Sequence, residues 1–325
     1  MPREHLRFAR RGQNQNFQGG NMNRRNFHRT LAGAALAAAH KPARSLAAVE
    51  ADAAGEGSAP FKFSVMLWTI FQNLPFEERL EKIAQAGYHS VELVNEFAKW
   101  TDDDYAKAIR KKQSLGLDFD TLLANDNYRE RPVTLVNPAH REGLLADVRS
   151  SLKIARRLEC PTMIVMSGNN QPGMTHEAQH ASIVEGLKRA AEVVEGQGVT
   201  LLLENIDLEE NPNYFLWSVL EAFQIMREVN HPQVKFLYDF FHAQISGGNL
   251  IENLEKNVAY VGLVHIADVP GRHQPGTGEI NYINIYRKLA ELRYNRYVAM
   301  EFLPSGDPVA LLKTARLEAI RAVTV

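Results

Sequence analysis

The sequence predicts a single (β/α)8 barrel, a TIM barrel, over residues 61–325, preceded by an N-terminal segment of different composition. Two observations predict this fold. From Phe61 onward, short apolar runs alternate strictly with longer amphipathic runs, which is typical of a parallel sheet because each parallel neighbour requires a crossover. The pattern repeats eight times in about 265 residues, which matches the number of units and the usual length of this barrel.

The eight expected strands are short apolar runs bounded by polar or turn-forming residues. They cover residues 63–67, 90–94, 117–122, 162–166, 199–203, 234–238, 260–264 and 297–300. A doubly wound open sheet is the alternative. Such a sheet usually carries a glycine-rich turn after its first strand, and the stretch 68–71, Trp-Thr-Ile-Phe, is not one.

The expected helices have apolar residues at helical spacing. They cover residues 75–86, 101–115, 139–158, 176–196, 215–229, 249–257, 282–292 and 308–322. Local residues support two of these boundaries. Gly87 is suited to end the first helix, and Thr101 is suited to cap the second, whose three aspartates follow at the positive end of the helix dipole.

Residues 1–56 are predicted to be an export signal and linker. Residues 1–30 carry seven arginines and one acid, and the Leu/Ala/Gly run at 31–39 is too short to span a bilayer. The pair Arg24 and Arg25, followed by Asn-Phe, resembles a twin-arginine signal for export of folded proteins. We therefore expect a periplasmic protein without stable membrane insertion. A disordered basic tail is the alternative, and the cleavage site and a true start at Met22 stay open.

Composition bears on the partners of the chain. The formal net charge is −1, and residues 1–56 hold nine Lys/Arg but only four Asp/Glu, so the remainder is mildly acidic. A mildly acidic protein does not attract the negatively charged backbone of nucleic acid, so the charge favours a small-molecule partner. The single cysteine, Cys160, excludes an intramolecular disulfide and is expected to be a small buried hydrophobe. Homo-oligomerisation is left open.

Polar side chains end the last four expected strands. These residues are Glu204, Asp239, His265 and Glu301. A strand that delivers a ligand to the open end of a barrel has a use for a carboxylate or imidazole there, whereas a purely structural strand does not. Three carboxylates and one imidazole suit a hard or borderline divalent cation. The sequence therefore predicts a metal site, although each residue alone also fits an ion pair or a core histidine.

Two stretches resemble a known family. Residues 238–244 read Y-D-F-F-H-A-Q, and residues 265–282 read H-I-A-D-V-P-G-R-H-Q-P-G-T-G-E-I-N-Y. Both resemble hydroxypyruvate isomerase and its relatives among the xylose isomerase-like barrels. The resemblance is dense over residues 199–304 and weaker back to Phe61, and it implies a xylose isomerase-like (β/α)8 barrel.

The resemblance also implies a cofactor and a reaction. One divalent ion, Mg²⁺ or Mn²⁺, would be held by Glu204, Asp239, His265 and Glu301, with Glu204 and Glu301 as the catalytic acid/base pair. Moving a proton between neighbouring carbons through an enediolate needs such a pair and a cation. The expected reaction interconverts hydroxypyruvate and tartronate semialdehyde or a similar small hydroxy-oxo acid. A ketose 3-epimerase and an oxo-tetronate isomerase are the alternatives.

Three further residues are expected to bind substrate. His242 lies three residues after Asp239 and is expected in a loop at the rim, where the resemblance implies that it contacts a substrate oxygen. Arg272 and His273 follow the seventh expected strand on a Pro-Gly turn, and the guanidinium suits a substrate carboxylate through bidentate geometry. A loop histidine and a surface salt-bridge arginine are the structural alternatives.

Other polar and aromatic residues have weaker patterns. Glu92 is expected either to orient a group at the rim or to form a structural ion pair. Trp68 and Phe71 either wall the pocket or pack in the core, and Glu210 is expected to reach toward the substrate. Glu279, in the Gly-Thr-Gly-Glu stretch, is expected to have a structural role in a turn.

Two stretches depart from the family pattern on the substrate side. Residues 125–138 form a polar, arginine-rich loop where a glycine-rich one is usual, and Asn-Ile-Asp rather than a proline turn follows Glu204. Both departures weaken the substrate assignment more than the reaction class.

Two other function classes stay open. One is a metallo-nuclease like the apurinic endonucleases, which would need a multi-zinc cluster and a basic face. The other is an exported sugar-binding barrel without catalysis.

Overall fold

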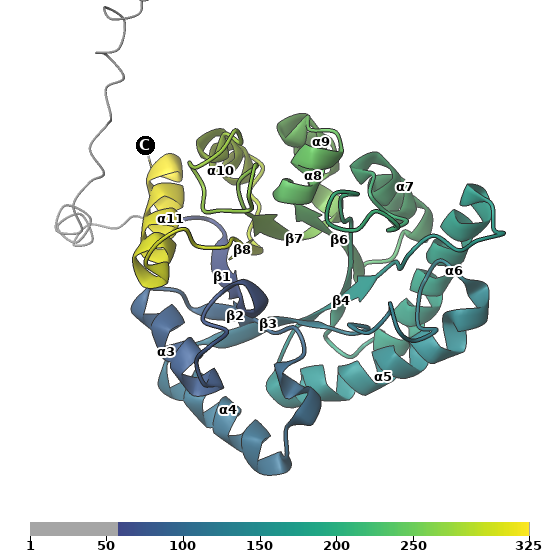
Figure 1. Cartoon of the computed structure of the whole chain (residues 1–325), viewed down its shortest axis with the longest axis horizontal. Coiled ribbons are helices and arrows are strands. Elements are labelled where there is room, and N and C mark those ends of the chain that lie inside the picture. The colour runs from purple at the N-terminus through teal and green to yellow at the C-terminus, as the bar shows by residue number, and fades with distance from the viewer. Residues whose placement is uncertain (1–57, 325) are drawn as a thin grey trace, which may run out of the picture. The chain divides into compact units, whose positions relative to one another are not determined.

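The computed structural model describes residues 58–324, so the predicted export segment and its paired arginines lie outside the described residues. Eight parallel strands pair in chain order, and β1 pairs with β8 to close the barrel. The helices surround the strands on the outside (Figure 1). The predicted (β/α)8 barrel is confirmed.

The strands lie within two residues of their predicted positions. They are β1 Lys62–Met66, β2 Ser90–Glu92, β3 Asp118–Leu123, β4 Thr162–Met166, β5 Thr200–Glu204, β6 Val234–Asp239, β7 Val261–Ile266 and β8 Tyr297–Met300. Both faces of these strands are buried, one inside the barrel and one under the helices, so their sequences are nearly continuous apolar runs rather than alternating ones. Leu201, Leu202 and Leu203 are accordingly all 0% exposed.

The helices follow the strands in the predicted order. They are α3 Phe76–Gln85, α4 Asp102–Ser114, α5 Arg141–Leu158, α6 His176–Val194, α7 Val219–Val229, α8 Phe240–Ser246, α9 Leu250–Asn257, α10 Tyr282–Glu291 and α11 Pro308–Val323. No helix of residues 58–324 is long and apolar enough to cross a membrane.

Capping residues explain where the helices start. Thr101 caps α4 through a complete capping box with Asp104, as its position predicted. The prediction of a helix from residue 215 was wrong by four residues, because the hydroxyl of Ser218 accepts the Glu221 N–H and starts α7 at Val219. The helix expected from residue 139 is α5, which a short 3-10 turn, Pro138–His140, precedes.

The helix α8 was not expected from the sequence. It follows β6 without a loop, because Asp239 Oδ1 accepts the backbone N–H groups of Phe241 (2.7 Å) and His242 (3.4 Å). The residue that ends the strand therefore also caps the helix. His242 was expected in a rim loop, and that expectation is corrected: it lies on this helix and is 2% exposed.

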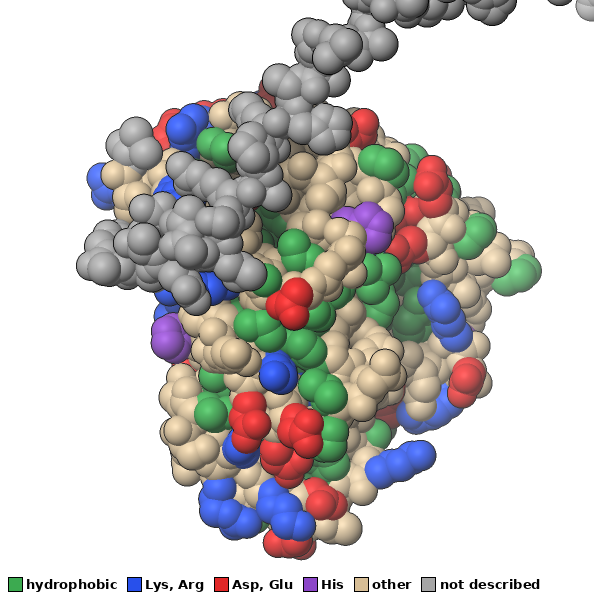
Figure 2. Space-filling model, turned by 60° about the vertical axis from the view of Figure 1, so that its left-hand side comes forward, with side chains coloured by type: hydrophobic (Ala, Val, Ile, Leu, Met, Phe, Trp, Pro, Cys, Tyr) green, Lys and Arg blue, Asp and Glu red, His purple; other side chains and the backbone are tan. Residues whose placement is uncertain are grey.

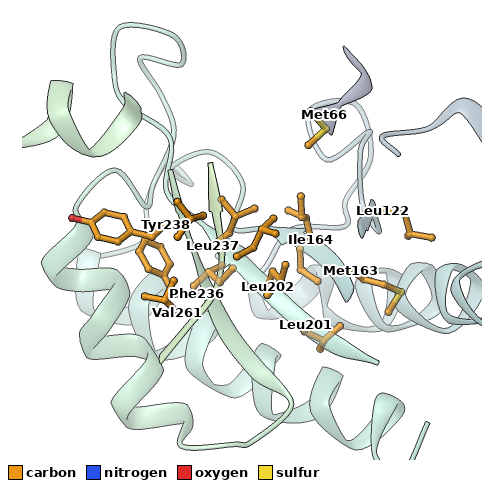
Figure 3. Close-up of a cluster of buried hydrophobic side chains, with 14 of the residues drawn as sticks. Met66, Leu122, Met163, Ile164, Leu201, Leu202, Phe236, Leu237, Tyr238 and Val261 are labelled. Atoms are coloured by element: carbon orange, nitrogen blue, oxygen red, sulfur yellow. The ribbon is translucent and has the colours of Figure 1, made fainter. Parts of the chain in front are cut away.

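Apolar side chains from neighbouring strands form the core. Figure 3 shows side chains of β5, β6 and β7 gathered beside those of β4, with Leu202, Phe236 and Leu237 among them. Cys160 is buried, as expected for a small hydrophobe, and burial raises the pKa of its thiol. The barrel is thus a packed scaffold that holds the ends of its strands rigidly.

A buried carboxylate joins the first three strands. The hydroxyls of Ser64 and Ser90 donate to Asp120 Oδ1 at 2.5 and 2.6 Å, and Asp120 Oδ2 has no hydrogen-bond partner among the described residues. Burial, and to a lesser degree the charge of Glu92, raises the pKa of Asp120 to about 8. The folded protein therefore holds Asp120 protonated at neutral pH.

We expect Asp120→Asn to remove a pH-dependent loss of stability. In the unfolded chain this carboxyl ionises near pH 4, while in the fold it keeps its proton up to about pH 8. Unfolding between these values releases a proton, so the wild type loses stability as pH rises, by an amount on the order of a few kcal/mol. Urea unfolding at pH 5, 7 and 9 checks this. The stability difference between variant and wild type should grow with pH, and a constant difference would contradict the assignment.

Candidate active site

The four predicted metal-ligating residues converge at one end of the barrel. Glu204 and Asp239 end β5 and β6, His265 lies one residue before the end of β7, and Glu301 follows β8. One ligand atom from each lies within 4.8 Å of the others, and all four residues are buried. The carboxyl ends of the strands are where barrels of this type place their active sites.

Two ligand atoms of this group lack a hydrogen bond. His265 Nδ1 lies 2.5 Å from Glu301 Oε2 and 3.7 Å from Glu204 Oε1, yet neither Nδ1 nor Oε2 makes a hydrogen bond among the described residues, although Arg272 Nη2 lies 2.8 Å from Oε2 as an ion-pair partner. Buried polar atoms are rarely left unpaired without a reason. A divalent cation would satisfy these atoms, and three carboxylates with one imidazole are ligands such an ion accepts.

Glu92 orients the histidine of this group. Its Oε2 lies 2.9 Å from His265 Nε2, and both side chains are 0% exposed. A carboxylate that takes the outer N–H of an imidazole fixes the ring and leaves the other nitrogen free for a metal. This one contact fits both roles expected for Glu92, since the carboxylate orients the His265 ring and also forms an ion pair with it when the ring is protonated.

Arg272 supplies positive charge beside two of these carboxylates, Asp239 and Glu301. It is 4% exposed, and each of its three guanidinium nitrogens contacts a protein acceptor. Nη1 lies 2.9 Å from Glu210 and 3.2 Å from His242 Nε2, and Nη2 lies 3.3 Å from Asp239 and 2.8 Å from Glu301. These contacts involve both terminal nitrogens of the guanidinium. Arg272 therefore has no free pair of N–H groups for the bidentate contact with a substrate carboxylate that was expected of it.

The long loop after β7 is folded around Asp268, which the sequence did not reveal as a structural centre. Its two carboxylate oxygens accept the backbone N–H groups of Val269, Gly276, Gly278 and Ile280. A Cβ at Gly278 would lie 1.9 Å from Val269 O, so only glycine fits there. Within this loop Arg272 adopts φ 56°, a conformation that costs a non-glycine residue on the order of 1–3 kcal/mol. The Pro-Gly-Arg-His stretch thus serves to place Arg272.

The His242 ring is held by Asp207, a carboxylate that the sequence pattern did not single out. His242 Nδ1 lies 2.6 Å from Asp207 Oδ2, and Asp207 Oδ1 accepts the N–H groups of Glu209 and Glu210. One regularity would have indicated it. Asp207, His242 and Asp268 each lie three residues after a predicted ligand, where the chain leaves its strand.

The surroundings push the two glutamates toward different protonation states. Burial raises the pKa of Glu204 to about 8, with Glu301 adding to this and His265 opposing it. Burial also disfavours ionised Glu301, but Arg272 and His265 outweigh it and hold the pKa of Glu301 well below its usual range. Two carboxyl groups with divergent pKa values are what an acid/base pair requires.

A cavity of about 660 Å³ opens onto this group. Its lining includes Glu204, Glu301, His242, Arg272 and Glu210, with Trp68 among the apolar walls. The indole of Trp68 also donates to Glu301 Oε1 at 2.6 Å.

Several expected residues lie elsewhere. Phe71 does not line the cavity, so of the two expected wall aromatics only Trp68 does. His273 lies outside the lining as well, with Nδ1 2.7 Å from Leu303 O. Glu279 accepts from Gln244 at 3.1 Å in the turn, consistent with its expected structural role.

Comparisons with known proteins agree with this architecture. Residues 80–320 match the family described as xylose isomerase-like TIM barrel. The 2-oxo-tetronate isomerase of Pectobacterium atrosepticum is 30% identical over 245 residues, which are 75% of this chain and 93% of that protein. The hydroxypyruvate isomerase of Escherichia coli is 30% identical over 253 residues, 78% of this chain and 97% of that protein.

Solved structures show the same barrel. A family 2 AP endonuclease from Brucella melitensis superimposes with a TM-score of 0.70 at 29% identity, covering 77% of this chain and 96% of that one. D-psicose 3-epimerase from Clostridium cellulolyticum has a TM-score of 0.65 at 20% identity, over 81% of this chain and 96% of that one, and shares the fold. From its matched residues and its relatives, the chain belongs to the xylose isomerase-like TIM barrel family.

Proposed function

We propose that this protein is a metal-dependent isomerase that interconverts a small hydroxy-oxo acid with its isomer through an enediolate. Hydroxypyruvate and tartronate semialdehyde are the leading pair, and the names of the relatives support this substrate class. The observation that carries the proposal is the pair Glu204 and Glu301, both of which line one cavity beside the shared group of buried ligands.

The chemistry follows from what the two glutamates can do. Isomerisation removes a proton from one carbon and returns it to the next, and positioned carboxylates catalyse both transfers. The Glu204 side chain makes no hydrogen bond among the described residues and lines the cavity, so it is placed to take and return a proton. Glu301 is held by Trp68 and Arg272 and stays ionised.

Asp239 and His265 would complete the ligand set for Mg²⁺ or Mn²⁺ with the two glutamates. A divalent ion held there supplies positive charge for the substrate oxygens. His242, fixed by Asp207 and lining the cavity, is placed to contact a substrate oxygen. Ketose 3-epimerase and oxo-tetronate isomerase remain the alternatives within this class, since both use the same proton chemistry.

The nuclease alternative is less well supported. A second group of possible ligands, Asp207, Glu210 and His242, lies next to the first. The guanidinium of Arg272 already contacts Glu210 and His242, which supplies positive charge where a second metal ion would otherwise be needed. Acidic and basic side chains also lie side by side on the face shown in Figure 2, unlike the basic face that binds nucleic acid.

We expect Glu204→Gln to abolish turnover while the fold persists. The loss should be on the order of 10²–10⁴ in rate, because general acid/base catalysis contributes about that much. Solvent deuterium exchange at the substrate carbon is followed with hydroxypyruvate, tartronate semialdehyde and free ketoses, each with Mg²⁺ or Mn²⁺. If the wild type exchanges with none of them but still binds sugars, a sugar-binding barrel is the better interpretation.

Metal binding provides a test that does not depend on turnover. Saturating Mn²⁺ should raise the Tm of the chelator-treated protein by about 5–10 °C, since a ligand at 100 times its Kd adds about 2.7 kcal/mol to stability. Glu92→Gln should move the midpoint of this titration to roughly 10–100-fold higher metal, because the orienting partner of His265 is weakened. Glu185→Gln, on the exposed face of α6, is the control. An unchanged midpoint in Glu92→Gln would argue against the site.

We also propose that the paired arginines direct export to the periplasm. The proposal rests on the sequence of residues 1–56. Replacing both Arg24 and Arg25 by lysine should leave the protein in the cytoplasm of a bacterial host, whereas Arg29→Lys in the same segment should not. Cell fractionation checks this. Export of the double variant at the wild-type level would rule the proposal out.

A further inference from the structure

A hydroxy-oxo acid brings a carboxylate into the cavity, and that carboxylate needs a cationic partner. Arg129 and Arg272 are the two arginines in the cavity lining, which also holds His242, a side chain already bonded to Asp207. Arg272 was the natural choice from the sequence, but its three nitrogens are occupied by Glu210, Asp239, Glu301 and His242. Moving the Arg272 guanidinium toward a substrate would leave the buried carboxylates of Asp239 and Glu301 without its counter-charge, and an uncompensated buried charge destabilises the fold.

Arg129 lines the same cavity as Arg272 but differs from it in exposure and in its partners. It is exposed, and no carboxylate of residues 58–324 lies within ion-pair distance of it. Its one hydrogen bond goes from Nε to the hydroxyl of Tyr128 at 3.2 Å, and its guanidinium lies 5.6 Å from the centre of that ring. Because Nε is the bonded atom, both terminal nitrogens stay free for bidentate contact with a carboxylate.

The loop that carries Arg129 is anchored beside the cavity. Tyr128 is 8% exposed and packs edge-on against Tyr214, and its hydroxyl accepts from Asn211 at 3.4 Å. At the start of the loop, the Asn125 side chain bonds to Val133 O and to both backbone groups of Met166, at the end of β4. The backbone that carries Arg129 is therefore anchored by the side chain of Asn125 and by the neighbouring Tyr128.

We propose that Arg129 binds the anionic end of the substrate and so selects a carboxylate-bearing substrate over a neutral ketose. This inference rests on the proposed function, whose substrate class it narrows. It also gives a role to the arginine-rich loop, residues 125–138, that replaces the glycine-rich loop usual in the family. Arg272 then acts as a positioning residue for Asp239 and Glu301.

The test compares binding and turnover in Arg129→Gln, Arg129→Lys and wild type. Tartronate, a hydroxy dicarboxylate that has no carbonyl to isomerise, is the binding probe, titrated calorimetrically into the Mn²⁺-supplied protein. Arg129→Gln should weaken tartronate binding about 10- to 100-fold, the usual worth of a charge-assisted pair, and Arg129→Lys should lose less. With the preferred acid the KM of Arg129→Gln should rise by a similar factor with little change in kcat.

A matched control lies two residues further along. Arg131 pairs with Asp147 on α5 at 3.0 Å and does not line the cavity, so Arg131→Gln should bind tartronate as the wild type does. Equal tartronate binding by Arg129→Gln and wild type overturns the proposal, whatever the enzyme turns over, as does a wild type that fails to bind tartronate. Weaker tartronate binding by Arg129→Gln, with wild-type binding by Arg131→Gln, supports the proposal, even where every acid fails as a substrate and the proposed reaction itself is refuted.

Discussion

The structure depends on how it balances the negative charge buried at the carboxyl end of the barrel. Glu92, Glu204, Asp239 and Glu301 all lie there with little or no exposure. Taking a carboxylate out of water costs several kcal/mol unless positive charge or hydrogen bonds compensate. His265 and Arg272 supply part of that compensation from the protein itself. A divalent cation at the four converging ligands would supply the rest.

Much of the surrounding structure serves to place those two cationic side chains. The interior position of Glu92 on β2 sets the orientation of the His265 ring. The loop after β7 closes on Asp268 and requires glycine at position 278, and it holds Arg272 in a left-handed backbone conformation. The strain is tolerated because the guanidinium gains three carboxylate partners.

The same balance of charge explains why the two glutamates that line the cavity differ in their partners. Glu301 is held by Trp68 and by Arg272, whereas Glu204 lacks a comparable partner among the described residues. The pKa of Glu301 is therefore lowered, while burial raises the pKa of Glu204, so the same site pushes the two carboxyl groups in opposite directions. Since Arg272 is committed to this arrangement, the proposed recognition of a substrate anion rests on Arg129, which the loop after β3 carries into the lining of the same cavity.

Hydrophobic patterning predicted the barrel, and the polar residues at the ends of its last four strands predicted the group that converges at its mouth. Eight alternating apolar and amphipathic runs leave few other folds, and a polar residue ending each of the last four strands has little structural use. Tertiary structure alone decided which charges neutralise one another. Arg272 and Glu210 are 62 positions apart, and Glu92 and His265 are 173 apart, so no local pattern joins them. The expectation for His242 failed for a local reason, because the cap by Asp239 turns an expected loop into α8. Hydrophobic periodicity reports which residues are buried, whereas the pairing of buried charges depends on distances that only the closed barrel sets.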